Sequence, residues 1–210
     1  MPLSYYENNT VNTLRLLESM TEHKIPNLIF SSTAAIYGNA TEDIVTEDSV
    51  AQPANPYARS KLMDEWAIAD TSLAHSLKFA VIRYFNVAGA DPELRMGQRS
   101  PQATHLIKVA SEVAVGLRKE LVIHGDDYPT PDGTGVRDYN HIEDIASAHL
   151  AALSYLEKGG PSVLVNCGYG KGYSVKEVLK ACKETLKIDV KFKVGPRRPG
   201  DVAKVVADAS

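Results

Sequence analysis

Short apolar runs alternate with longer amphipathic stretches along the chain, and this alternation sets the expected fold. The short runs predict strands at 27–33, 79–84, 121–123, 136–139, 163–166 and 190–194. The longer stretches, in which apolar residues recur at helical spacing, predict helices at 8–23, 57–74, 103–117, 142–157 and 174–186. Strands that alternate with helices are typical of an α/β protein with a mainly parallel sheet.

Composition and charge narrow the class of protein. The chain has 210 residues, 44% of them hydrophobic and 23% charged, as is typical of a globular protein. A formal net charge of -3 without blocks of like charge argues against a nucleic-acid-binding face. No apolar run approaches the roughly 20 residues of a membrane span. Cys167 and Cys182 are too far apart for a CxxC motif, so we expect reduced thiols, no metal site and a cytoplasmic location.

Tyr57 and Lys61 form the one Tyr-x-x-x-Lys of the sequence. At this spacing both side chains lie on one face of a helix, one turn apart. An ammonium beside a phenol favours the phenolate, so the tyrosine can act as a base below its ordinary pKa of about 10. Chance alone predicts roughly 0.7 such pairs in a chain of this composition, so the pair is informative only in context.

The context is a strand that ends in polar residues just before this helix. Ser31, Ser32 and Thr33 end the predicted strand at 27–33. The carboxyl ends of strands in a doubly wound sheet open onto the cofactor crevice, where a hydroxyl can bond a substrate oxygen. A strand-end Ser or Thr, a loop and then a Tyr-x-x-x-Lys helix resemble the arrangement of short-chain dehydrogenases/reductases.

Six sequence blocks, spread over almost the whole chain, make the resemblance more specific. They are YENN at 6–9, FSSTAAIYG at 30–38, NPYARSK at 55–61, RYFN at 83–86, GTGVRDY at 133–139 and RRPGD at 197–201. The first three are similar to the extended branch of the short-chain dehydrogenase/reductase superfamily. The last three are similar to the UDP-glucose 4-epimerase family in particular, and all six stand in that family's order.

The resemblance implies a partial Rossmann-like, doubly wound parallel sheet and a smaller C-terminal substrate-binding α/β region. Residues 1–86 would form the rear of a NAD-binding domain, and 87–210 would mainly bind the UDP-sugar, with 136–166 returning to the first sheet. The implied isomerase reaction, part of galactose metabolism, epimerises C4 of UDP-glucose and UDP-galactose reversibly through a 4-keto sugar, with bound NAD. A homodimer formed through helices at 8–22 and 57–74 is implied as well.

The resemblance also assigns roles to individual residues. Tyr57 would remove the proton of the sugar 4-hydroxyl, Lys61 would lower the pKa of Tyr57 and hold the nicotinamide ribose, and Thr33 would hydrogen-bond the 4-oxygen. The implied cofactor-binding residues are Asn8, Ser31, Ser32, Tyr57, Lys61 and Tyr84.

Substrate-binding residues are expected in the second half of the chain. Arg137 and Arg198 are candidates for clamping the diphosphate because guanidinium forks match phosphate oxygens. Asp201 would accept the ribose hydroxyls, and the backbone at 122–124 would pair with uracil. The full implied set is Thr33, Phe85, Asn86, His105, Leu106, Val122, His124, Arg137, Arg198, Asp201 and Val205.

Other features favour a structural interpretation. The glycine-rich segment 168–172 lacks the third glycine of a dinucleotide loop, because Tyr173 stands there. Ser174 and Glu177 instead have the spacing of a capping box. His141, before two acidic residues, marks a strand-to-helix junction.

The chain also departs from the family. The N-terminal Gly-rich NAD fingerprint and the C-terminal tail are missing, so we expect a fragment that binds cofactor weakly and is inactive alone. Val205 stands where some members carry a Tyr that crowds the sugar 2-position. A small residue there leaves room for an N-acetyl group, so UDP-GlcNAc and UDP-GalNAc are expected as further substrates.

Two alternatives remain open. A nucleotide-sugar dehydratase or 5-epimerase shares the Tyr-x-x-x-Lys motif, but dehydratases place acidic residues where this chain has Ala34 and Ala35. A non-catalytic protein of the same fold tends to lose Tyr57 or Lys61, and both are present.

Overall fold

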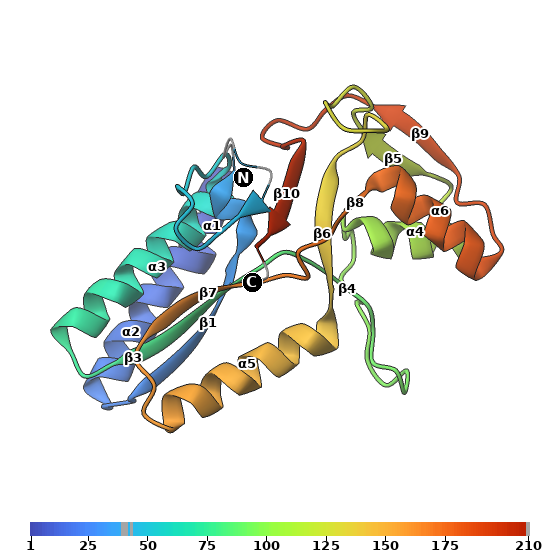
Figure 1. Ribbon diagram of the computed structural model, residues 1–210. Helices are drawn as coiled ribbons and strands as arrows, with labels where there is room; N and C mark the ends of the chain where they lie inside the picture. The colour runs from blue at the N-terminus through green and yellow to red at the C-terminus, as the bar shows by residue number, and fades with distance from the viewer. Residues whose placement is uncertain (39–41, 43, 209–210) are drawn as a thin grey trace.

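The computed structural model describes residues 1–38, 42 and 44–208 (Figure 1). Its helices are α1 (Pro2–Tyr5), α2 (Asn12–Glu22), α3 (Pro56–Ala74), α4 (Leu106–Ala114), α5 (Ile142–Glu157) and α6 (Val175–Leu186), with a π-helix η1 (Tyr6–Val11) and a 3-10 helix η2 (Ala34–Tyr37). Its strands are β1 (Asn27–Thr33), β2 (Ile44–Val45), β3 (Lys78–Tyr84), β4 (Asn86–Ala88), β5 (Leu121–His124), β6 (Val136–His141), β7 (Val163–Cys167), β8 (Gly172–Ser174), β9 (Phe192–Gly195) and β10 (Lys204–Ala207).

The first sheet is parallel and has helices on both faces. Its strand order is β1-β3-β7, and Figure 1 shows α2 and α3 on one side and α5 on the other. The α2–α3 side is sealed by an apolar cluster of Leu17, Met20, Leu28, Ile68 and Leu77. This arrangement confirms the expected α/β class and its partial, doubly wound, Rossmann-like sheet.

The register of this sheet determines which residues meet at its carboxyl edge. Thr33 at the end of β1 lies beside Tyr84 at the end of β3, and Tyr84 lies beside Cys167 of β7. The polar strand end expected from the sequence therefore adjoins the end of the neighbouring strand.

Helix α3 begins where the sequence signals a start. The Asn55 side chain accepts a hydrogen bond of 2.9 Å from the amide of Ala58, and Pro56 occupies the first turn. This cap places Tyr57 in the first turn of α3, directly after the loop that follows the strand end, and Lys61 one turn later.

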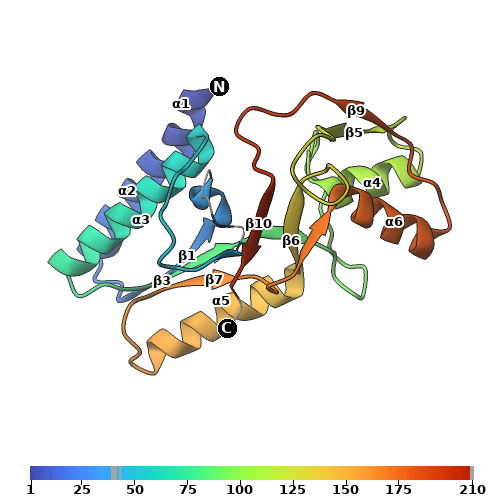
Figure 2. The ribbon, with the colours of Figure 1, turned by 45° about the horizontal axis from the view of Figure 1, so that its top comes forward.

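The remaining strands form a second, mixed sheet and a small two-stranded one. The second sheet has the order β2-β10-β6-β4, with β8 antiparallel to β6. β5 and β9 pair in parallel, and α4 and α6 cover them through a core that includes Val109, Leu121, Ile123 and Leu179. Figure 2 shows β10 and β6 between this region and the first sheet.

Several boundaries differ from the sequence prediction. The strand expected at 190–194 is not the last one, because β10 follows it and pairs with both β6 and β2. The helix expected at 103–117 is shorter, since His105 is still extended and Gly116 ends it with a positive φ of 78°. Of the segment 136–166, β7 belongs to the first sheet and α5 packs against that sheet, whereas β6 pairs in the second sheet.

The glycine-rich segment 168–172, the Ser174–Glu177 pair and His141 make local structural contacts in the folded chain, as the sequence predicts. The amides of Tyr169 and Gly170 donate to the buried side chain of Asp138, so the glycine-rich loop binds a group of the chain itself. Ser174 and Glu177 form the capping box of α6, and His141 caps α5 by accepting from an amide of its first turn. In the described part of the chain, no helix is long and apolar enough to cross a membrane.

Candidate active site

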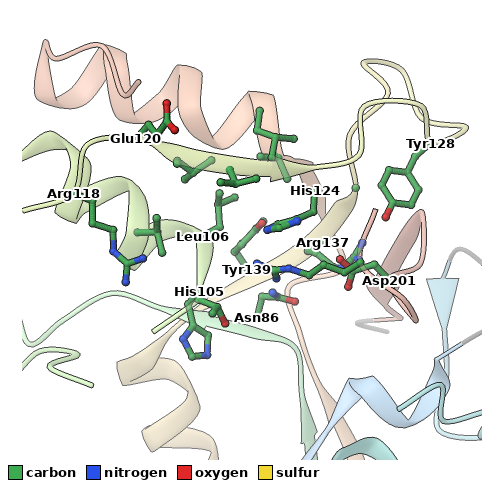
Figure 3. A pocket seen from close by; sticks show the side chains of 18 residues that line it. Asn86, His105, Leu106, Arg118, Glu120, His124, Tyr128, Arg137, Tyr139 and Asp201 are labelled. Atoms are coloured by element: carbon green, nitrogen blue, oxygen red, sulfur yellow. The ribbon is translucent and has the colours of Figure 1, made fainter. Parts of the chain in front are cut away.

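A large cavity opens at the carboxyl edge of the first sheet. It has a volume of about 1020 Å³, and the residues around it include Thr33, Tyr57, Tyr84 and His149. A smaller cavity of about 380 Å³ lies against β5 and β6 (Figure 3). Both cavities are lined by Asn86, His105, Arg137 and Asp201. The two cavities therefore adjoin between the first sheet and the C-terminal region, and together they are called the groove below.

Thr33 and Tyr57 meet in the large cavity. Thr33 ends β1, and its hydroxyl accepts from the amide of Ala35 at 3.2 Å, which fixes the side chain at the start of η2. Burial raises the pKa of Tyr57, while a hydrogen bond with the Thr33 side chain lowers it in part. The ring of Tyr5 packs edge-on against that of Tyr57, with 5.9 Å between ring centroids. The phenol therefore remains protonated at neutral pH.

In the folded chain, burial determines the direction in which the pKa of Tyr57 shifts. The Nζ atom of Lys61 lies 3.9 Å from the centroid of the Phe30 ring. Burial lowers the pKa of the Lys61 ammonium, and Asp64 and Glu65 raise it in part. Helical spacing fixes the Cβ atoms of Tyr57 and Lys61, but the long lysine side chain extends toward β1 instead.

Ser31, Tyr84 and His149 form a group that the sequence did not reveal. His149 Nδ1 lies 2.8 Å from the carbonyl oxygen of Ile145, which can only accept, so Nδ1 carries the proton of the neutral ring. The other nitrogen, Nε2, then accepts from the Ser31 hydroxyl at 2.7 Å. The His149 ring also lies 6.3 Å from the ring of Tyr84. The one feature of the sequence that could have revealed this group is a histidine on the inner face of the predicted 142–157 helix.

Ser32 points away from the groove. It is fully buried and donates to the carboxylate of Glu65. That carboxylate is paired with Arg83, whose Nη2 lies 2.6 Å from Oε2. Arg83 in turn donates to the Tyr37 hydroxyl at 3.0 Å, and Tyr37 donates to Asn166 at 2.7 Å. This network joins β1, α3, β3 and β7 behind the cavity.

Arg137 is held in place before any ligand binds. Its guanidinium donates to the carbonyl oxygens of Val136 and Val202, both at 2.8 Å. Asp201 follows Arg198 in a turn closed by a backbone hydrogen bond of 3.1 Å. Figure 3 shows the side chains of Arg137 and Asp201 close together in the smaller cavity. Arg198 and Asp201 line the same cavity as Arg137, and Arg118 and Glu120 line it as well.

All four residues of β5 line the smaller cavity, and strand alternation determines how deeply each one is buried. Leu121 and Ile123 are buried in the core against α4 and α6, while Val122 and His124 are half-buried. His105, at the start of α4, bonds Gln98 through Nδ1 at 2.9 Å.

Most of the expected site residues line the groove. Those that do are Ser31, Thr33, Tyr57, Tyr84, Phe85, Asn86, His105, Leu106, Val122, His124, Arg137, Arg198, Asp201 and Val205. Asn8, Ser32 and Lys61 are not among the lining residues. His149, Tyr128 and Tyr139 line it and were not expected. Within the described ranges, no cluster of three or more His, Cys, Asp or Glu is placed to hold a metal ion.

The fold and the groove define a class of protein. A doubly wound parallel sheet with Thr, Tyr and Lys at the carboxyl end of one strand and the following helix is the arrangement of the short-chain dehydrogenases/reductases. The chain belongs to the NAD dependent epimerase/dehydratase family, which matches residues 1–168.

Relatives and solved structures agree with this family. The chain is 50% identical over 208 residues to the UDP-glucose 4-epimerase of Azospirillum brasilense, covering 99% of this chain and 60% of that protein. It is 52% identical to the UDP-Glc/GlcNAc 4-epimerase of Campylobacter jejuni, with a TM-score of 0.81 and coverage of 100% and 64%. The Bifidobacterium longum UDP-glucose 4-epimerase, solved with NAD+ and UDP, has 40% identity, a TM-score of 0.92 and coverage of 99% and 63%. The chain thus spans about 60% of its curated relatives' length.

Proposed function

We propose that this chain carries the catalytic base and the UDP-sugar groove of a UDP-glucose 4-epimerase. The observation behind the proposal is that Thr33 and Tyr57 line the same groove as Arg137, Arg198 and Asp201. A pair of hydroxyls at one end and phosphate-binding guanidiniums at the other fit a nucleotide-sugar. The relatives named above act on such substrates by name.

Tyr57 would act on the sugar 4-hydroxyl and Thr33 would hold its oxygen. In the structure Tyr57 is a neutral phenol of raised pKa, so it is a proton donor at neutral pH and becomes a base only beside a positive charge. The same phenol can return the proton when the 4-keto sugar is reduced again, because removal and return of the proton are reverse steps.

The hydroxyls of Ser31, Tyr57 and Tyr84 and the apolar wall of the large cavity fit the nicotinamide end of NAD. When bound, NAD supplies the hydride acceptor for C4 of the sugar. His149 would orient Ser31 and Tyr84 toward it. Asn8, Ser32 and Lys61, which are not lining residues, would act through neighbouring side chains or after rearrangement.

The second half of the groove would grip UDP and leave the sugar free to turn. Arg137 and Arg198 would bind the diphosphate, Asp201 the ribose hydroxyls, and the backbone at 122–124 the uracil. Arg137 is already held by two carbonyl oxygens, so little side-chain entropy is lost on binding.

Val205 would let the sugar carry an N-acetyl group. It lies on β10, lines the large cavity and packs against the core cluster that includes Phe85. A compact side chain there favours UDP-GlcNAc and UDP-GalNAc as additional substrates. The neighbour from Campylobacter jejuni is named a UDP-Glc/GlcNAc 4-epimerase.

A homodimer in the cytoplasm is part of the proposal. Apolar side chains of α2 and α3, among them Leu16 at 49% and Trp66 at 58% exposure, are open to solvent. A second copy that covers the helices at 8–22 and 57–74 would bury them. The alternatives, a related dehydratase or a non-catalytic protein of this fold, are disfavoured by Ala34 and Ala35 after Thr33 and by the presence of Tyr57 and Lys61.

The decisive experiment measures conversion of UDP-galactose to UDP-glucose by the full-length protein that contains this chain. Tyr57→Phe removes only the phenolic oxygen, so kcat should fall by at least about 100-fold. Tyr155→Phe, on the outer face of α5 and 41% exposed, is the matched control and should leave kcat unchanged. If kcat fell equally in both variants, or did not fall in Tyr57→Phe, Tyr57 would not be the catalytic base.

A further inference from the structure

Tyr128 is a buried side chain whose hydroxyl is left without a partner. It lies in the turn between β5 and β6 and is only 6% exposed. Among the residues that the structure describes, nothing hydrogen-bonds its hydroxyl oxygen. A buried polar group without a partner is unfavourable in the free protein. Such a group persists where a ligand supplies the missing bond, or where it has another role that offsets the cost.

The Tyr128 ring is held by Arg197 and by the turn that carries it. The Arg197 guanidinium lies 4.1 Å from the Tyr128 ring centroid, and an ion pair of 2.7 Å with Asp127 holds that guanidinium. Gly125 lets the ring approach, because a Cβ there would lie 2.8 Å from Tyr128 Cε2 and 2.6 Å from Arg197 Cγ. A backbone bond of 2.9 Å from the Tyr128 amide to Gly133 closes the turn. The hydroxyl is therefore aimed in a fixed direction.

That direction is into the smaller cavity. Tyr128 lines it together with Arg137, Arg198 and Asp201, and Figure 3 shows the hydroxyl pointing toward Arg137 and Asp201. Burial, followed by the charge of Asp201, raises the pKa of Tyr128. The group is therefore a hydrogen-bond donor at neutral pH, placed beside a phosphate-binding guanidinium.

We propose that the Tyr128 hydroxyl donates a hydrogen bond to a diphosphate oxygen of the bound nucleotide. The inference rests on the proposed function, which places a nucleoside diphosphate in this cavity, and adds a binding residue to it. The proposal also assigns different roles to the adjacent residues Arg197 and Arg198. Arg198 lines the cavity, while Arg197 stacks on the Tyr128 ring and pairs with Asp127.

The test uses the full-length protein that contains this chain, as wild type and as the Tyr128→Phe variant. Isothermal titration calorimetry measures the affinity of each for UDP and for uridine. The substitution keeps the ring and its stack on Arg197 and removes one oxygen. Tyr128→Phe should bind UDP about tenfold more weakly than wild type does, which is the typical effect of losing one hydrogen bond to a charged group. Both proteins should bind uridine equally well. Without ligand the variant should melt at the same temperature as wild type or higher, because an unpaired buried hydroxyl has been removed. Tyr155→Phe, which removes an exposed hydroxyl, should change none of these values.

Three results would overturn the inference. Unchanged UDP affinity in Tyr128→Phe excludes the phosphate bond and leaves the proposed function intact. An equal loss for UDP and uridine, or a lower melting temperature without ligand, shows that the hydroxyl serves the nucleoside or the fold. Failure of wild type itself to bind UDP contradicts the proposed function as well, and so can be told apart from the other two.

Discussion

For the side chains of Tyr57 and Lys61, burial determines the direction of the pKa shift more than the charges beside them do. Burial raises the pKa of Tyr57 and lowers that of Lys61, so both groups favour their neutral forms more than they do in water. The sequence predicted the reverse for Tyr57, since the spacing to Lys61 is visible but the desolvation is not. A bound positive charge would then be needed to make Tyr57 a base.

Asp64 gives a residue-scale prediction about stability and pH. It is fully buried on α3, and burial raises its pKa to about 6, although the charge of Lys61 and a hydrogen bond with Thr10 lower the pKa in part. The folded chain therefore holds the proton up to about pH 6, whereas the unfolded chain loses it near pH 4. Stability from this group is present below pH 4 and is lost as the pH rises to 6.

Asp64→Asn should accordingly raise the melting temperature at pH 7, and the gain should disappear at pH 4. Thermal unfolding at the two pH values measures this. Asp70→Asn on the exposed side of the same helix is the control and should show little change at either. A variant that is less stable than wild type at pH 7 would mean that the attraction between Asp64 and Lys61 outweighs the cost of burial.

The helices and strands behind the groove are joined by buried charges. Arg83 of β3 pairs with Glu65 of α3, which also accepts from Ser32 of β1. Removing one member leaves a buried charge without its partner. The position of α3, and hence of Tyr57, depends on this network.

Glu65→Leu should lower the free energy of unfolding by about 3–5 kcal/mol, the typical effect of breaking a buried ion pair. Urea unfolding of the chain measures it. Glu184→Ala, in a surface pair with Lys180 at 66% exposure of the glutamate, should change it by less than about 1 kcal/mol. Equal effects in both variants would show that the Glu65–Arg83 pair does not hold α3.

Long elements with an apolar stripe or a clear cap were predictable from the sequence, and short elements were not. α3, α5 and α6 follow the sequence prediction within one residue at either end, because their apolar stripes or caps are clear. β2, β4, β8 and β10 have two to four residues, too few to show a period, and exist because partners elsewhere in the chain supply their hydrogen bonds.

The site was predictable where strand geometry alone decides it. Alternation along β1 turns Ser31 and Thr33 to one side and Ser32 to the other, so the burial of Ser32 against Glu65 was readable in principle. The contact of Ser31 with His149, 118 positions away, depends on the packing of α5. The burial of the Tyr128 hydroxyl depends on the fold of the turn that carries it and on the loop that carries Arg197, so it could not be predicted from the sequence.

Across the whole molecule, the groove joins the first sheet to the C-terminal region, so substrate choice depends on residues far apart in sequence. Val205 on β10 and Phe85 after β3 line the same cavity. In the full-length protein, Val205→Tyr should lower kcat/KM for UDP-GlcNAc by at least about tenfold, because a side chain that crowds the 2-position excludes the N-acetyl group. UDP-galactose, with only a hydroxyl there, should be converted as before.

Parallel kinetics on the two sugars measure this selectivity. Equal loss for both substrates would mean that the tyrosine disturbs β10 and not the sugar pocket. Absence of UDP-GlcNAc turnover in the Val205 protein would contradict the proposed breadth of substrate.

The most direct test of the central claim follows the hydrogen at C4 itself. The full-length protein is incubated with UDP-galactose carrying deuterium at C4, and the UDP-glucose formed is examined by mass spectrometry and proton NMR. Epimerisation in this groove predicts UDP-glucose with the deuterium still at C4, since the hydrogen returns to the carbon that it left. No conversion, or UDP-glucose in which solvent hydrogen has replaced the label, would contradict the account.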